Sequence, residues 1–151
     1  LGISLTELYR ELATYPVKGA YVFLDACFSG GYKSAAPLLA QKGVRVVPKV
    51  GLPQGKTLSF SSSSGDQTSS VYHDKKQGYY TYFLIKTIKD ARGDLSMKDL
   101  FERTSAAVKK ATAMIGKMQE PQCMVSPTWF GWESLRLETP VEPAPVAPQG
   151  E

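Results

Sequence analysis

The spacing of hydrophobic residues changes along the chain and predicts helices interleaved with buried strands. A helix is expected from about Ser4 to Thr14, because Ser4 and Glu7 form a capping-box pattern and leucines follow at helical spacing. The runs Ala20–Ala26 and Thr57–Ser63 are rich in apolar or β-forming residues and are too short for helices. They are typical of strands that are buried on both faces of a parallel sheet.

The second half of the chain predicts two helices and little further sheet. Helical spacing covers Tyr79–Ala91 and Ser96–Ile115, with Ser96 as the cap of the longer helix. Lys117–Pro127 is expected to be a loop, and Thr128–Leu137 to add an edge strand. Residues 138–151 contain four prolines, which predicts an extended, disordered linker or tail. The aromatic residues of this half are expected to lie mostly in the core: Tyr79, Tyr80, Tyr82, Phe83, Trp129, Phe130 and Trp132.

Composition narrows the class of protein. Of the 151 residues, 42% are hydrophobic and 21% are charged, so we expect one folded domain over residues 1–137. No apolar run reaches the roughly 20 residues of a membrane span, and no secretory leader pattern is present. The lysines and arginines behind the net charge of +4 are scattered. Together with only two cysteines, this favours a cytoplasmic protein that binds neither nucleic acid nor a membrane.

Candidate chemistry follows the two predicted strands. Cys27 ends the first one beside small residues, where free N–H groups could stabilise an oxyanion, but a buried unreactive thiol fits the pattern equally well. Asp25 lies two residues before it, and Asp66 lies in the polar loop after the second strand. A carboxylate in such a place either caps backbone N–H groups or forms the floor of a pocket. Because parallel strands end at the same edge of a sheet, we expect one shared site.

Other chemistry has little support in the sequence. The only histidine, His73, is expected to be a solvated loop residue. One histidine and two distant cysteines form no metal-binding cluster. The run of serines in Ser61–Ser70 lacks the glycine and lysine pattern of a phosphate-binding loop.

Several segments in order resemble the caspase, metacaspase and bacterial caspase-homologue group of cysteine peptidases. The segment that ends in Asp25-Ala26-Cys27-Phe28-Ser29-Gly30 is similar to the D-x-C-x-S-G form of the nucleophile segment in metacaspases and bacterial relatives. The later segments that resemble the group are Ser61–Ser70, Gly78–Leu84, Asp94–Leu100 and Gln119–Gln122.

The resemblance implies a three-layer α/β/α sandwich with a mainly parallel sheet. It implies a cysteine endopeptidase in which Cys27 is the nucleophile and its backbone N–H forms part of the oxyanion hole. Asp25 and Asp66 would receive the Lys or Arg side chain before the cleaved bond of a protein or peptide substrate. No cofactor is implied. Some members need calcium, for which the dispersed acidic residues assign no site.

The chain departs from the family pattern at the catalytic base. In caspases a histidine lies about 50 residues before the cysteine. Only 26 residues precede Cys27, and none is histidine. We therefore expect a piece that begins at Leu1, after the strand bearing the histidine, so that amino-terminal strands of the sheet are missing. The amino-terminal half would be its partner, as in a zymogen processed in loops. The alternative is a catalytically inactive caspase-like module that binds partner proteins.

Overall fold

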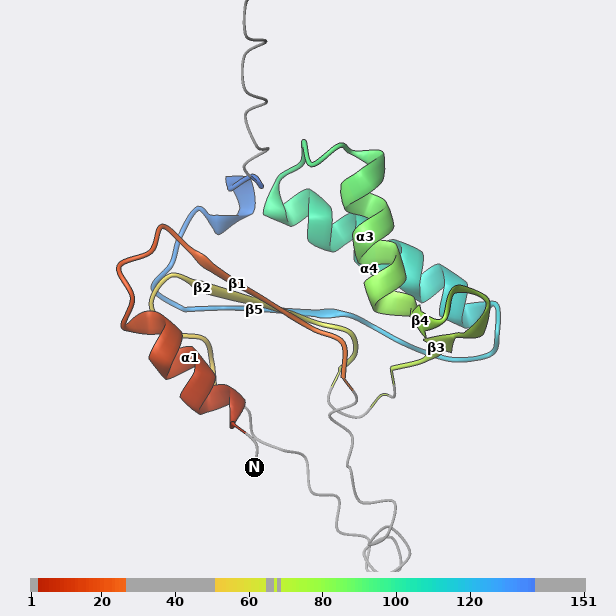
Figure 1. The fold of residues 1–151 in the computed structure, drawn as a ribbon, viewed down its shortest axis with the longest axis horizontal. Coiled ribbons are helices and arrows are strands. Elements are labelled where there is room, and N and C mark those ends of the chain that lie inside the picture. Colours follow the sequence, from red (N-terminus) through yellow and green to blue (C-terminus); the bar gives the residue numbers. More distant parts are fainter. Residues whose placement is uncertain (1–2, 27–50, 65–66, 68, 138–151) are drawn as a thin grey trace, which may run out of the picture.

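The computed structural model describes residues 3–26, 51–64, 67 and 69–137. Cys27, Asp66 and the proline-rich segment 138–151 lie outside the described residues. Within the described part, the elements form three layers (Figure 1). Helix α1 covers one face of a sheet, and helices α3 and α4 cover the other face.

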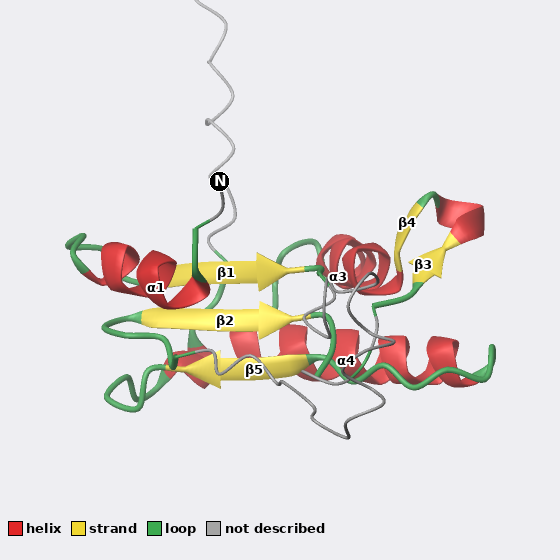
Figure 2. Ribbon diagram, turned by 90° about the horizontal axis from the view of Figure 1, so that it is seen from below, coloured by secondary structure: helices red, strands yellow, loops and turns green. Residues whose placement is uncertain are grey.

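The central layer is a mixed sheet whose described strands have the order β1-β2-β5. Strand β1 (Ala20–Leu24) pairs in parallel with β2 (Thr57–Ser61), as predicted. Strand β5 (Gln122–Val125) pairs antiparallel with the other edge of β2, and it points the opposite way in Figure 2. The prediction of a loop throughout Lys117–Pro127 was therefore wrong. Four residues between two prolines carry a weak strand signal, and their pairing with β2 decides the outcome.

The two parallel strands differ in burial. Every residue of β2 is buried, because the strand has a neighbour on each side and helices on both faces. The prediction that β1 is also buried on both faces was wrong, since its residues are half-buried and the Phe23 side chain is 38% exposed. Among the described residues, β1 has a hydrogen-bonded neighbour on one side alone.

The helices begin and end close to their predicted bounds. Helix α1 spans Leu5–Ala13, and the Ser4 hydroxyl accepts a hydrogen bond from the Glu7 N–H at its start. Helix α3 spans Tyr79–Asp90, and helix α4 spans Met97–Ala113. The buried side chains between sheet and helices α3 and α4 form the core: Leu58, Phe60, Tyr80, Leu95, Met97, Leu100 and Val108.

Helix α1 is joined to the sheet by a buried polar contact. The leucines at helical spacing are half-buried, and the fully enclosed residue of the helix is Tyr9. The Tyr9 hydroxyl donates a hydrogen bond of 2.8 Å to the Ser59 hydroxyl in the middle of β2. Because Ser59 is also buried, this bond satisfies two polar groups that water does not reach.

The segment after β5 differs from the prediction. The prediction that Thr128–Leu137 forms an edge strand was wrong. A turn at Gly131 leads into a short 3₁₀ helix, η2 (Trp132–Ser134). In this segment the described β pairing is a single bridge between Ser96 and Arg136. Phe130 is 87% exposed, so its assignment to the core was wrong. The other aromatic residues of this half are buried or half-buried: Tyr79, Tyr80, Tyr82, Phe83, Trp129 and Trp132.

A small hairpin precedes helix α3. Strands β3 (Val71–Tyr72) and β4 (Gln77–Gly78) pair antiparallel around the 3₁₀ helix η1 (His73–Lys75). No helix in the described part of the chain combines the length and the apolar character that crossing a membrane requires.

Candidate active site

Polar groups gather where β1 and β2 end. Both strands point toward the start of helix α3 and the hairpin β3–β4 (Figure 2). The residues that follow the two strands are joined by hydrogen bonds. Ala26, after β1, is bonded to Ser62, after β2, and Asp25 is bonded to helix α3. This edge is the place where open α/β sheets carry their chemistry.

Asp25 caps helix α3 from outside the helix. Its Oδ2 atom accepts a hydrogen bond of 3.2 Å from the Thr81 N–H and one of 2.5 Å from the Thr81 hydroxyl. Thr81 lies in the first turn of the helix, where N–H groups lack helical partners. The residue at the cap position, Gly78, has no side chain to offer. Of the two alternatives for Asp25, the capping contact is thus present in the structure, and the carboxylate is exposed to solvent.

Gly78 makes room for that carboxylate. A Cβ atom at Gly78 would collide with Oδ2 of Asp25. The backbone of Gly78 has φ −66° and ψ 150°, which any residue adopts readily. The constraint at Gly78 is therefore one of space rather than of conformation, and it is set by the tip of the Asp25 side chain.

Two hydroxyls hold the carbonyl that precedes the predicted nucleophile. The Ser62 and Ser69 hydroxyls each donate to the Ala26 carbonyl oxygen at 3.3 Å, and the two hydroxyls also contact each other. One step earlier, the Leu24 carbonyl accepts the Ser62 N–H at 2.8 Å. The serine run, which lacks the pattern of a phosphate-binding loop, thus connects the end of β1 to the loop after β2.

Gln119 fastens the same loop. Its side chain is 1% exposed, Nε2 donates to the Ser62 carbonyl at 2.9 Å, and Oε1 accepts the Ser70 N–H at 2.9 Å. A further bond of 2.7 Å runs from the Glu120 N–H to the Gln67 side chain. Gln119 lies in the segment Gln119–Gln122 that resembles the family, and its sequence context alone predicts no role for it. Pro121, two residues further on, indicates a loop in this part of the sequence, but no local pattern marks the burial of Gln119.

The electrostatics of the site keep two neighbouring groups neutral. Burial raises the pKa of Tyr80 above its ordinary value, and the negative charge of Asp25 adds to the effect, as would the charge of Cys123 once its thiol is ionised. Burial, followed by the charge of Glu133, raises the pKa of the Cys123 thiol to about 12. Because the thiolate is the nucleophilic form of cysteine, Cys123 is unreactive at neutral pH.

The predicted site residues are placed as follows. Asp25 lies at the carboxyl end of β1, and Cys27 directly follows the anchored Ala26 in the chain. Cys27 and Asp66 lie outside the described residues, so the predicted meeting of Asp25 with Asp66 stays a prediction. His73 is exposed in η1, which agrees with the expectation of a solvated residue. Among the described residues, no three His, Cys, Asp or Glu side chains cluster as metal ligands.

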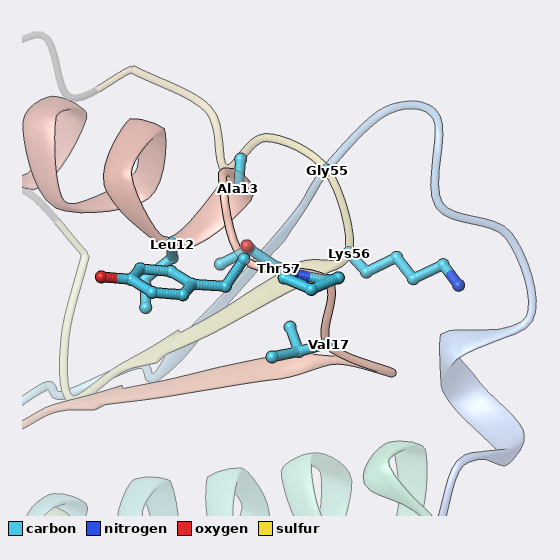
Figure 3. Close-up of a pocket in the computed structure, with 8 residues that line it drawn as sticks. Leu12, Ala13, Val17, Gly55, Lys56 and Thr57 are labelled. Atoms are coloured by element: carbon cyan, nitrogen blue, oxygen red, sulfur yellow. The ribbon is translucent and has the colours of Figure 1, made fainter.

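A cavity of about 430 Å³ lies at the opposite end of the parallel strands. Its walls come from the end of helix α1, with Leu12 and Ala13, from Val17 before β1, and from Gly55–Thr57 at the start of β2 (Figure 3). None of the predicted site residues lines it. The cavity is therefore separate from the strand ends where the candidate site lies.

The fold and the site together indicate a broad class, the α/β/α enzymes. An α/β/α sandwich with polar groups at the ends of two parallel strands is an arrangement that supports enzymes of many kinds. The sequence then matches the family described as the caspase domain over residues 2–128. The chain belongs to the caspase domain family, which consists of cysteine peptidases, and the predicted resemblance is confirmed. Comparisons with curated proteins and with solved structures returned no match.

Proposed function

We propose that this protein is a cysteine endopeptidase that hydrolyses peptide bonds after Lys or Arg, with Cys27 as the nucleophile. The observation that carries the specificity is the position of Asp25. Its carboxylate lies two residues before Cys27 at the end of β1, exposed to solvent. Oδ2 is committed to Thr81, whereas no hydrogen bond within the described residues involves Oδ1. We infer that a cationic side chain of the substrate binds this carboxylate through a charge-assisted hydrogen bond.

The proposed chemistry has two covalent steps. The Cys27 thiolate attacks the carbonyl carbon of the basic residue, and the oxyanion that forms accepts a hydrogen bond from the Cys27 N–H. The peptide C–N bond then breaks, a protonated histidine gives its proton to the leaving amine, and a thioester remains. Water hydrolyses the thioester, which releases the acid and restores the thiol. No cofactor takes part in these proposed steps.

The base is proposed to come from the part of the protein encoded before Leu1. His73 is the only histidine of the chain and lies exposed in η1, three residues beyond the buried Ser70. Asp66, in the loop after β2, is proposed to complete the acidic pocket with Asp25. Opposite charge would attract Lys and Arg side chains, and like charge would reject Asp.

Assays of the full open reading frame with fluorogenic peptides test the proposal. Wild type, Cys27→Ala and the matched cysteine variant Cys123→Ala are each given peptides with Arg, Lys or Asp before the reporter. We expect wild type and Cys123→Ala to cleave the Arg and Lys peptides and Cys27→Ala to cleave none. Cleavage of the Asp peptide faster than the Arg peptide would refute the pocket. Cleavage by Cys27→Ala would refute the nucleophile, and a wild type without activity would favour the inactive binding module.

A further inference from the structure

Gln119 connects two backbone groups that are eight residues apart. Its amide bonds the Ser62 carbonyl with Nε2 and the Ser70 N–H with Oε1, both at 2.9 Å. These groups lie at the two ends of the loop that follows β2. All three residues are buried, so water does not compete for the bonds. A side-chain amide has one donor and one acceptor side, which is the pairing that these two groups require.

The two residues that Gln119 binds, Ser62 and Ser70, are linked to the end of β1. Ser62 contacts it directly, and Ser70 is the direct neighbour of Ser69, which also contacts it. Ser62 offers its carbonyl to Gln119 and its hydroxyl to the Ala26 carbonyl, and Ser69, next to the clamped Ser70, donates to the same carbonyl. A shift of the loop would therefore shift the hydroxyls, and with them Ala26. From the other side, Asp25 is held by the first turn of helix α3. Residues 25 and 26 are thus held from two directions directly before Cys27.

We propose that Gln119 is a positioning residue, which fixes the loop after β2 and thereby sets the direction in which the chain leaves Ala26 toward the nucleophile. This inference rests on the proposed function of Cys27. Gln119 touches neither substrate nor thiol in this role and acts through Ser62, Ser69 and the Ala26 carbonyl. The role explains why a fully buried position carries a polar amide, since an apolar side chain would leave two buried backbone groups without partners.

The test compares Gln119→Asn with the same substitution at Gln122. Asparagine keeps the amide but is one methylene shorter, so it reaches one end of the loop at a time. Gln122 is exposed, and its side chain donates to the Glu120 carbonyl instead of to Ser62 or Ser70. In the full-length protein we expect Gln119→Asn to lower kcat by about 10- to 100-fold, the scale of a misplaced reacting group, with KM little changed. Gln122→Asn should match wild type.

A second measurement separates positioning from loss of structure. Alkylation of each cysteine by iodoacetamide is followed by peptide mass spectrometry. We expect slower alkylation of Cys27 in Gln119→Asn, because a displaced thiol loses its base, and unchanged slow alkylation of Cys123 in β5. Faster alkylation of Cys123 alongside the loss of kcat would mean that the sheet has loosened, and it would overturn the positioning role. Equal kcat in the Gln119 and Gln122 variants would overturn it too.

Ser69→Ala keeps the inference testable if Gln119→Asn does not fold. This change removes one hydroxyl from the Ala26 carbonyl and should also lower kcat rather than raise KM. An unchanged kcat would overturn the inference. Where both variants fold, their combined loss should be smaller than the product of the separate losses, because both act on one carbonyl. The Cys27→Ala control separates the two proposals. If Cys27→Ala stays active, the proposed function is refuted. If Cys27→Ala is inactive but Gln119→Asn is fully active, only the positioning role is refuted.

Discussion

Asp25 combines two effects, a helix cap and a negative charge, that substitutions can separate. Asp25→Asn keeps a side-chain oxygen that can accept from the Thr81 N–H and hydroxyl, but it removes the charge. Asp25→Ala removes both. The proposed function needs the charge, whereas the stability of helix α3 needs mainly the acceptor. The two variants should therefore resemble each other in activity and differ in stability.

The structure sets the size of each effect. Loss of a helix cap costs about 1 kcal/mol, and a charged acceptor roughly doubles a hydrogen bond, so Asp25→Ala should lower the free energy of unfolding by about 1–2 kcal/mol. Asp25→Asn should lower it by less than about 1 kcal/mol. An unpaired charge at an interface costs about 2–5 kcal/mol. Because Asp25 is exposed, we expect the lower end, about 2 kcal/mol, or a loss of roughly 30-fold in kcat/KM.

Urea unfolding and cleavage of an Arg peptide, measured on the full-length protein, test both parts. The matched control is Asp74→Asn, which removes an exposed carboxylate from η1 and should change neither quantity. We expect both Asp25 variants to lose kcat/KM on the Arg peptide. If Asp25→Asn cleaves that peptide as fast as wild type and Asp25→Ala alone is slow, Asp25 is a cap and not a specificity residue. The pocket would then be refuted.

Gly78→Ala approaches the same carboxylate from the other side. The backbone angles of Gly78 suit alanine, so on conformation alone the substitution would be neutral or slightly stabilising. The new Cβ instead displaces the Asp25 carboxylate. Gly78→Ala should therefore reproduce the losses of Asp25→Ala in stability and in kcat/KM. A variant as stable and as active as wild type would contradict the close approach.

Three further results are expected. Residues 1–151 alone should not cleave the Arg peptide, because a thiol without a base is only a few per cent thiolate at neutral pH. In the full-length protein, His73→Ala should leave cleavage of that peptide unchanged. If residues 1–151 do cleave it and His73→Ala abolishes the cleavage, His73 is the base. The folded pKa of Cys123, about 12, lies above the unfolded value of about 8.5, so the unfolded chain ionises first and stability should fall as pH rises through this window. In urea titrations between pH 8 and 10, Cys123→Ala should show a shallower fall, and identical slopes would contradict the raised pKa. The buried Thr104 hydroxyl has no partner among the described residues, so Thr104→Val should raise the free energy of unfolding by about 1 kcal/mol, and a lower melting temperature would contradict this.

The sequence by itself determined the elements whose signals are local. A cap residue and leucines at helical spacing are enough to begin helix α1 at Leu5, and Ser96 begins helix α4 in the same way, with its hydroxyl accepting the Asp99 N–H. The parallel pairing of β1 with β2 also followed from composition, because short runs of β-forming residues suit a covered sheet. The candidate chemistry at the ends of these strands and the caspase-like family were visible in the residues themselves.

Only the tertiary structure decided the features that depend on distant partners. The four residues of β5 form a strand because they pair with the second edge of β2. Strand β1 is less buried than its composition suggests because, among the described residues, it has a hydrogen-bonded strand on one side alone, whereas β2 has one on each side. Asp25 reaches Thr81 across 56 positions, and Gln119 reaches Ser62 across 57. A hydrogen bond between such distant residues has no local spacing to mark it in the sequence, because folding of the intervening chain brings the partners together.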